Sequence, residues 1–338
     1  MTVTYSLEVS KARFAGFIKL LLWWKGSIYR LLYRELVIFL MLFYFFAVIY
    51  RFALTSEQQI IFEYVCMYCR KFDLRVPMAF VLSFYIGVVI SRWWDIFLAL
   101  PWPDRCALNI NAFIKGTDDE SRKIRRCLVR YLNAAAILTL RSVSMPIKKR
   151  FPTLRHVVKA GILTSEELKL IETTPTPYGI EVLPISWFSN VLSEAYLNAK
   201  IAGPVFCHRI LEEAMLFKEC CERLFHYDWI SVPIVYTQTV SITVYSYFFI
   251  ATLGRQRLIQ ELFVDQQAPH QAYNFAVSEY FPLHILAEFF FYLGWLKTAE
   301  QLINPLGEDD DDFELNYVVD RNIQARTKLN LCNETDFG

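Results

Sequence analysis

The sequence predicts an all-α membrane protein with four membrane-spanning helices and a cytosolic helical part. Of its 338 residues, 55% are hydrophobic and 16% are aromatic, which is more apolar area than the surface of a soluble protein usually exposes. Uncharged runs approach or exceed the roughly 20 residues that a helix needs to cross a bilayer. The formal net charge is +1, so bulk charge gives no reason to expect a nucleic-acid partner.

The first two predicted spans lie within residues 36–100. Leu36–Tyr50 is uncharged and strongly aromatic, and predicts the first membrane helix. Val76–Ser91 is uncharged for 16 residues and, continued to Leu100, predicts the second. Residues 55–73 between them are polar and few, and indicate a loop on the outer side of the membrane.

The third and fourth predicted spans lie within residues 229–296. Trp229–Gly254 is uncharged for 26 residues, the longest such run in the chain. Phe281–Leu296 predicts the fourth span, although it contains His284 and Glu288. Ionisable side chains at membrane depth are expected to face the interior of a helix bundle or a wet cavity.

Three parts of the chain are predicted to lie in the cytosol. Residues 101–228 indicate a soluble helical domain whose first half is basic, and residues 1–35 are basic as well. By the positive-inside rule both lie on the cytosolic side. An even number of spans returns residues 297–338 to the same side.

Two local patterns predict helices in the cytosolic domain. Thr164 followed three residues later by Glu167 is a capping box, which opens a helix. Residues 210–225 carry apolar side chains at helical spacing, which predicts an amphipathic helix packed on a core. These apolar positions are Ile210, Ala214, Phe217, Cys221 and Leu224.

An acidic run follows the fourth span. Six acidic residues occupy the seven positions from Glu308 to Glu314, and hard oxygen ligands in this number suit Ca²⁺. A solvated acidic tail is the alternative. The turn residues 304–307 before the run, and Phe313 and Tyr317 in or after it, favour an ordered site. Four contiguous aspartates do not fit the ligand spacing of an EF-hand.

The second predicted span carries Val76, Phe80 and Phe84 at intervals of four residues, so these side chains share one face of the helix. The face is either core packing or a pore lining. In a symmetric oligomer a pore lining would form stacked apolar rings that gate by dewetting.

Enzyme chemistry is not indicated. The chain has no glycine-rich phosphate loop, no Gly-x-Ser-x-Gly and no His-Glu-x-x-His. Its eight cysteines show no disulfide framework, and the Cys66/Cys69 pair lacks the βαβ context of a redox motif.

Several motifs together resemble the bestrophin family of anion channels. The resemblance runs from Thr4 to Asn322 and is specific, because the matching stretches are distributed over this whole length. They are Ser91–Trp94, Leu100–Arg105, Arg141–Ser144, Tyr227–Ser231, Val235–Gln238, Gly294–Lys297, Ala299–Glu314 and Val319–Asn322. The longer cytosolic tail of the family is expected to be absent or shortened.

The resemblance implies a homopentamer around one central pore, with four membrane helices from each subunit. It also implies a Ca²⁺ clasp, a hydrophobic neck and a lower aperture. The implied Ca²⁺ ligands are the side chains of Asp309 and Asp312 and the backbone carbonyls of Ser10, Gln301 and Glu308. The implied neck residues are Val76, Phe80 and Phe84, and the implied aperture residue is Val205.

The implied function is a calcium-activated channel of the plasma membrane for chloride and other monovalent anions, with both termini cytosolic. The partners are the lipid bilayer, four further copies of the chain and, in mixed assemblies, other membrane proteins. Three departures from the family pattern bear on conduction. Residues 95–99 are unusually apolar and end at Ala99, His284 replaces an aromatic residue, and Glu288 replaces an amide. They keep one alternative open, a non-conducting subunit that anchors or assists another membrane complex.

Overall fold

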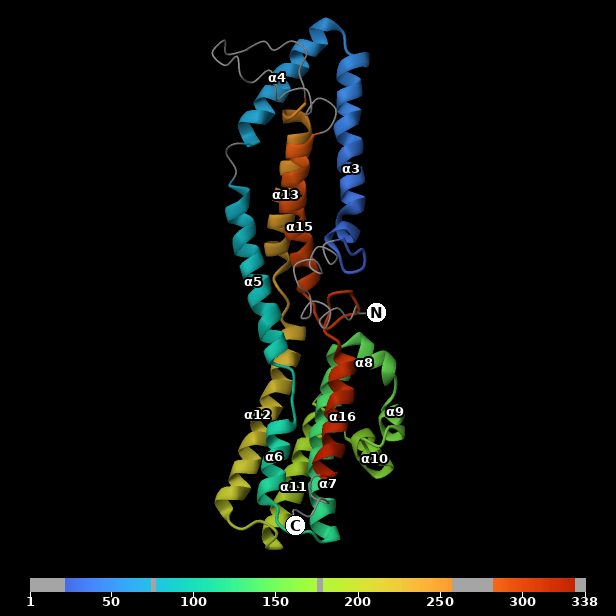
Figure 1. The fold of residues 1–338 in the computed structure, drawn as a ribbon, viewed down its shortest axis with the longest axis vertical. Helices are drawn as coiled ribbons and strands as arrows, with labels where there is room; N and C mark the ends of the chain where they lie inside the picture. Colours follow the sequence, from blue (N-terminus) through green and yellow to red (C-terminus); the bar gives the residue numbers. More distant parts are fainter. Residues whose placement is uncertain (1–21, 74–76, 175–178, 257–281, 332–338) are drawn as a thin grey trace. The chain divides into compact units, whose positions relative to one another are not determined.

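The computed structural model describes residues 22–73, 77–174, 179–256 and 282–331, and its regular structure there is helical (Figure 1). Within these ranges the one β-type contact is an isolated bridge between Ile114 and Ile201. The chain divides into two compact units. Of the described residues, the membrane unit contains 22–73, 77–92, 232–256 and 282–303, and the second unit contains 93–174, 179–231 and 304–331.

Three of the described helices are long and apolar enough to cross a membrane. They are α3 (Ile28–Val48) with the π-helical turn Ile49–Ala53 that continues it, α5 (Met78–Leu98) and α13 (Ile234–Gly254). They correspond to the first three predicted spans, with shifted ends. Helix α3 begins before Leu36, and α13 begins after Pro233 because Trp229 ends a separate helix.

A fourth helix, α15 (Leu283–Leu302), occupies the place of the fourth predicted span. It extends beyond Leu296 and carries Glu288, Lys297 and Glu300. These charges make it more polar than the other three, and by length and composition it is not among the candidate spans. Lys297 forms ion pairs with Glu300 and with Glu35 of α3 at 2.9 and 3.2 Å.

Residues 55–73 form a helix, so the predicted loop is wrong. This helix, α4 (Ser56–Asp73), packs along α13. A methyl group at Gly254 of α13 would lie 3.0 Å from the backbone nitrogen of Arg70, so the close approach needs a glycine there. The polar composition hid an amphipathic helix: Glu63 and Cys66 are fully buried, and the Tyr50 hydroxyl donates to Glu63.

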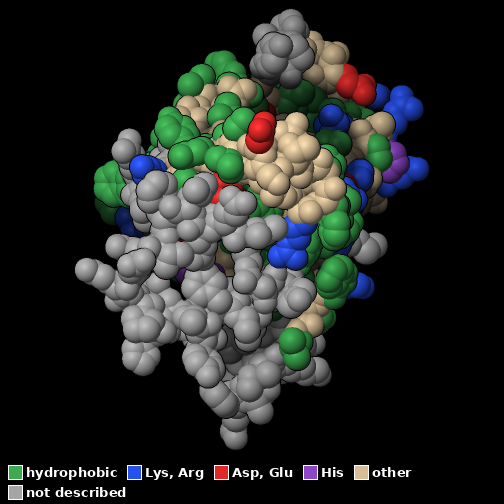
Figure 2. All heavy atoms as spheres, turned by 90° about the horizontal axis from the view of Figure 1, so that it is seen from above, with side chains coloured by type: hydrophobic (Ala, Val, Ile, Leu, Met, Phe, Trp, Pro, Cys, Tyr) green, Lys and Arg blue, Asp and Glu red, His purple; other side chains and the backbone are tan. Residues whose placement is uncertain are grey.

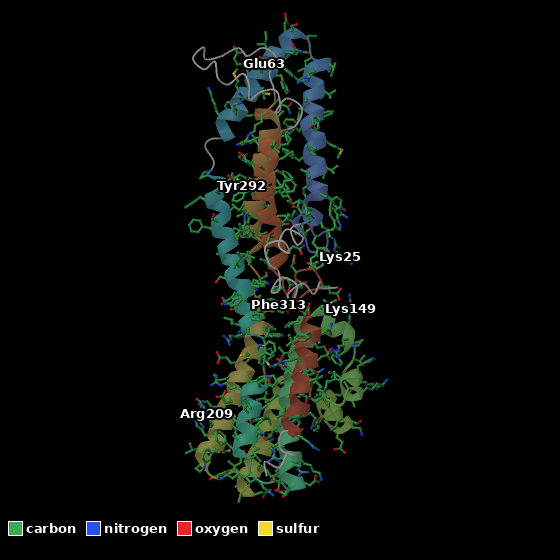
Figure 3. The ribbon with its side chains drawn as sticks, viewed as in Figure 1. Lys25, Glu63, Lys149, Arg209, Tyr292 and Phe313 are labelled. Atoms are coloured by element: carbon green, nitrogen blue, oxygen red, sulfur yellow. The ribbon has the colours of Figure 1, made fainter. Side chains whose placement is uncertain are left out.

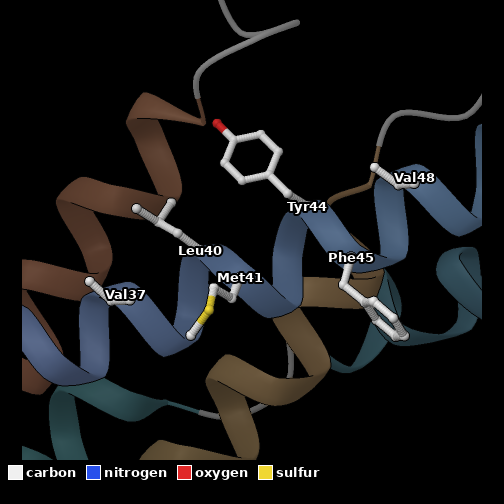
Figure 4. Close-up of a pocket in the computed structure, with 6 residues that line it drawn as sticks. All are labelled: Val37, Leu40, Met41, Tyr44, Phe45 and Val48. Carbon is white, nitrogen blue, oxygen red and sulfur yellow. The ribbon is translucent and has the colours of Figure 1, made fainter.

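Helices α3, α5, α13 and α15 share the apolar core of the membrane unit. Each contributes buried side chains at helical spacing, and aromatic rings meet at its centre: the Phe39 and Phe289 ring centroids are 4.9 Å apart. Other apolar side chains of these helices face outward. A shallow apolar groove runs along α3 (Figure 4), lined by Val37, Leu40, Met41, Tyr44, Phe45 and Val48. Figure 2 shows hydrophobic side chains over much of the described part of one face.

The second unit is built around α7 (Asp119–Val143), most of whose C-terminal half is buried. One cluster packs α7 against α6, α11 and α12, and another packs it against α8, α9, α10 and α16. These helices are α6 (Asp104–Phe113), α8 (Met145–Arg150), α9 (Leu154–Lys159), α10 (Ser165–Thr173), α11 (Val182–Leu197), α12 (Pro204–Trp229) and α16 (Leu315–Leu331).

Both local predictions in this unit are confirmed. Thr164 caps α10, and Glu167 completes the capping box through hydrogen bonds in both directions. All five apolar positions predicted on residues 210–225 are buried in α12.

Candidate functional site

The exposed face of α5 carries two aromatic side chains in contact with each other. Phe80 and Phe84 are 63% and 60% exposed, with ring centroids 4.7 Å apart in an edge-to-face arrangement. The opposite face of α5 is buried in the core of the membrane unit through Leu82, Tyr85 and Val89. The alternative of core packing within one chain therefore does not hold for Phe80 and Phe84.

The third residue of this predicted face, Val76, lies outside the described residues. Val205, the predicted aperture residue, is the second residue of α12 and is 74% exposed. Its exposure follows from the start of the helix: Gly203 is the cap, Pro204 is the first helical residue, and the buried face of α12 begins only at Ile210.

The acidic residues lie in a compact turn between α15 and α16. The Asp309 amide donates to Oδ2 of Asp312 at 2.6 Å, and the Phe313 amide donates to the carbonyl of Pro305 at 2.9 Å. A methyl group at Gly307 would lie 2.8 Å from Oδ2 of Asp312, so this glycine admits the carboxylate to the turn. The segment is thus a folded loop, which we call the acidic loop (residues 304–314).

Asp312 is the buried carboxylate of the acidic loop. Its residue is 7% exposed, and burial raises the pKa of its carboxyl to about 6, with Asp309 and Asp311 adding to the rise. An ionised carboxylate in such surroundings is stabilised by a cation. The carboxylate oxygens of Asp309 and Asp312 are hard donors of the kind that Ca²⁺ prefers.

The rim of the acidic loop is held by basic residues of α8. Lys149 forms an ion pair with Glu308 at 2.5 Å, and Arg150 pairs with Asp320 of α16 at 2.6 Å. Figure 3 labels Lys149 together with Phe313 of the loop. The Glu308 side chain is thus directed to Lys149 of α8.

Phe313 connects the acidic loop to α5. Its ring centroid lies 5.4 Å from that of Trp93 and 5.5 Å from that of Phe97, both in the last turns of the helix that carries Phe80 and Phe84. Sequence reasoning missed this contact. The available signal was the aromatic residue inside an otherwise acidic run, which needs an apolar partner.

The remaining predicted ligands do not belong to the described part of the unit that contains this loop. Gln301 lies in the last turn of α15 in the membrane unit, and Ser10 lies outside the described residues. Among the residues that the structure describes, no three His, Cys, Asp or Glu side chains are placed to hold a metal ion. A site here therefore needs backbone carbonyls in addition to Asp309 and Asp312.

The two polar departures in the fourth span form one cluster with α13. Glu288 pairs with Arg255 at 2.8 Å and accepts a hydrogen bond from the Tyr247 hydroxyl at 3.0 Å. His284 lies 3.3 Å from Glu288. Glu288 thus faces α13, as expected for an ionisable group at this depth. The same expectation is not met for His284, whose side chain is 84% exposed. Ala99, in contrast, is fully buried in the core of the second unit.

These features define the class of the protein as an all-α membrane protein with an aromatic face exposed on one span. A protein-family model described as bestrophin, RFP-TM, chloride channel, matches residues 1–329. The chain belongs to the bestrophin family. That is a family of channels and not of enzymes, in agreement with the sequence motifs.

Relatives are similar along almost the whole chain. It is 46% identical over 326 residues to bestrophin-1 of Sus scrofa and 47% identical over 326 residues to bestrophin-2 of Mus musculus, each covering 96% of this chain. Bestrophin homolog 15 of Caenorhabditis elegans is 36% identical over 336 residues, or 98% of the chain. The chain spans 55%, 62% and 62% of the lengths of these three relatives.

The fold is also found in solved structures. A variant of a bacterial bestrophin homolog from Klebsiella pneumoniae has a TM-score of 0.61, with 90% of this chain and 98% of that chain covered. The identity is 14%, so this likeness concerns the fold alone.

Proposed function

We propose that this protein is a calcium-activated channel for chloride and other monovalent anions. Five copies would surround one pore in the plasma membrane, with both termini in the cytosol. Phe80 and Phe84, with Val76, would form the gate, and Val205 would form a second constriction.

The observation that carries the proposal is the exposure of Phe80 and Phe84, at 63% and 60%, on a helix whose opposite face is buried. Five copies of this face around an axis would make two adjacent aromatic rings. A constriction lined by such rings excludes water when narrow, which stops ions without any charge in the gate. The same lining favours weakly hydrated anions, because dehydration is the main cost of passing it.

Calcium control is supported by the composition and folding of the acidic loop. The residues that would hold Ca²⁺ are Asp309 and Asp312 through their side chains, and Ser10, Gln301 and Glu308 through backbone carbonyls. The ion would supply the positive charge that offsets the crowded carboxylates. Because Phe313 packs against Trp93 and Phe97, a change in loop packing has a direct mechanical route to α5.

A non-conducting subunit that anchors or assists another membrane complex is the second candidate. It is favoured by the cluster of Glu288, Arg255 and Tyr247, in which Glu288 replaces the amide that the resemblance leads us to expect. The two candidates differ in one measurable property, the passage of anions.

The experiment is anion flux into liposomes that contain the purified protein, measured with and without micromolar Ca²⁺. Calcium-dependent chloride flux is expected, and a variant with Phe80 and Phe84 both changed to Ala should pass anions without Ca²⁺. A protein that folds and inserts but passes no anions, including in this variant, would contradict the channel and support the accessory subunit.

A further inference from the structure

We propose that Asp95 places a ring of negative charge on the pore at the inner side of the neck, where it limits anion current and sets the selectivity of anions over cations. This inference rests on the proposed channel and adds to it a residue that controls permeation.

The register of α5 places Asp95 on the aromatic face. The helix is continuous from Met78 to Leu98, and Asp95 follows Phe84 by three turns. At 100° per residue the two positions differ by about 20° around the axis. Ser91, which lies between them on the same face, is also exposed. The buried face of this helix carries Leu82, Val89 and Ile96 instead.

The Asp95 side chain is exposed and, within the part of the chain that the structure describes, makes no hydrogen bond or ion pair. Two buried carboxylates of the same unit are paired instead: Glu213 is bound by Arg105 at 2.8 Å, and Glu167 by Arg130 at 2.7 Å. Asp95 is therefore a charge that the protomer leaves uncompensated.

The surroundings decide what the carboxylate faces. It lies in the last turn of a helix that is long and apolar enough to span a bilayer, between Trp94 and Leu98, which are 51% and 55% exposed. An ionised carboxylate at the end of a membrane-spanning helix is expected to face water or a partner and not lipid. With no partner in the described protomer, and on the face of Phe84, it faces the water of the pore.

Five such carboxylates around one axis would act together. A water-filled passage with charge of one sign concentrates counter-ions and depletes co-ions, here cations and anions respectively. In this chain Asp95 is the one acidic residue in the otherwise apolar segment 93–99. The ring would therefore reduce anion current without closing the gate.

The first test is the chloride conductance of Asp95→Asn, Asp95→Glu and Glu172→Gln in planar bilayers. Glu172 is an exposed glutamate of α10 and serves as the matched control. At about 0.1 M salt, where the screening length is about 10 Å, Asp95→Asn should conduct at least about threefold better than the wild type. At about 1 M salt, with a screening length of about 3 Å, the gain should shrink.

Asp95→Glu and Glu172→Gln should conduct like the wild type. Equal conductance of Asp95→Asn and wild type at low salt would overturn the proposal. A change that is the same at both salt concentrations would also overturn it, because it would be structural and not electrostatic.

The second test does not need a conducting protein. In a Ser91→Cys variant, the rates of modification at position 91 by a cationic and an anionic thiol reagent of equal size are measured by mass spectrometry. Adding Asp95→Asn should lower the cationic-to-anionic ratio by about tenfold or more if five carboxylates share the passage. A change below about twofold is expected of one isolated carboxylate in water and would overturn the ring. A wild type that passes no anions would contradict the proposed function but not the proposal for Asp95. The ratio of modification rates would still test whether five Asp95 carboxylates share one passage.

Discussion

The side chain of Asp312 is buried although it follows three further aspartates in the chain. Its carboxylate accepts the Asp309 amide and fills the space that Gly307 leaves, so the fold fixes one oxygen-rich position in a loop whose other acids are more exposed. At the scale of single residues, this separates Asp312 from its neighbours of identical chemistry.

Asp312→Asn should abolish activation by Ca²⁺. The amide keeps the size of the side chain, but it removes the charge and half of the oxygen ligands that a hard cation needs. Flux into liposomes should stay at its calcium-free level over the whole range of added Ca²⁺. Asp310→Asn makes the same chemical change in the same loop at a position outside the implied ligand set, and it should keep the calcium response. If Asp312→Asn keeps the same calcium response as Asp310→Asn, the acidic loop has no part in the gating mechanism.

A second prediction at the scale of residues concerns the contribution of the Glu167–Arg130 ion pair to the stability of the fold. Arg130 donates to both carboxylate oxygens at 2.7 Å, and the two side chains are 11% and 14% exposed. Burial opposes ionisation of Glu167, but the bonds from Arg130 and the Thr164 amide outweigh it and lower the pKa of Glu167. A carboxyl with a lowered pKa stabilises the fold above its unfolded pKa of about 4.3, and this stability is lost as the pH falls through the folded value.

Glu167→Gln keeps the capping box, because glutamine serves at that position, but it leaves Arg130 as a buried unpaired charge. We expect a loss of about 3 kcal/mol in the free energy of unfolding at neutral pH. In thermal unfolding of the detergent-solubilised protein, the difference from the wild type should shrink as the pH is lowered below about 4. Glu166→Gln, on the exposed neighbouring side chain, should change little. A difference that does not depend on pH would contradict the ion-pair explanation.

At the scale of elements, the sequence predicts helices by their apolar runs and fails where polarity hides an amphipathic pattern. The uncharged run Val76–Ser91 and the stripe from Ile210 to Leu224 are confirmed as α5 and α12, because burial of one helical face leaves a periodic signal. The helix α4 at residues 55–73 was not predicted because one of its buried positions is the charged residue Glu63. The Tyr50 hydroxyl donates a hydrogen bond to Glu63, and no local sequence pattern reveals this contact. Contacts between distant elements are invisible in the same way.

The contact of Phe313 with α5 is such a case, and it yields the element-scale prediction. Phe313→Leu keeps an apolar side chain but loses the aromatic contacts with Trp93 and Phe97. Aromatic pairs contribute about 1 kcal/mol each, so the Ca²⁺ concentration for half-maximal flux should rise about fivefold or more. The affinity of the closed channel for Ca²⁺, measured directly by calorimetry, should be nearly unchanged. Tyr317→Leu, which removes a ring that is 65% exposed on α16, is the control and should leave the calcium dependence as it is. An equal shift of the calcium dependence in both variants would show that the contact of Phe313 with α5 does not couple Ca²⁺ binding to the gate.

At the scale of the whole molecule, one chain alone cannot surround a pore. The predicted neck face of α5 is exposed in the protomer, and the predicted aperture residue Val205 is exposed on α12. In the proposed channel, both faces acquire a function only when copies of the chain meet around an axis, and periodicity within one sequence cannot specify that step. The resemblance implies five copies, and the mass of the purified assembly measures that number directly.

The gate itself depends on the assembly, and Phe80→Ala tests it. If the aromatic rings exclude water from a narrow neck, replacing one ring of five phenyl groups by methyl groups widens and wets that level. The variant should pass chloride without Ca²⁺, and added Ca²⁺ should raise the flux only slightly. Phe45→Ala makes the same truncation at a ring that is 57% exposed on α3, in the apolar groove away from α5, and it should remain closed without Ca²⁺. A Phe80→Ala protein that assembles with the same mass and still needs Ca²⁺ would show that the barrier to ions lies at another level of the pore, with Val205 as the next position to truncate.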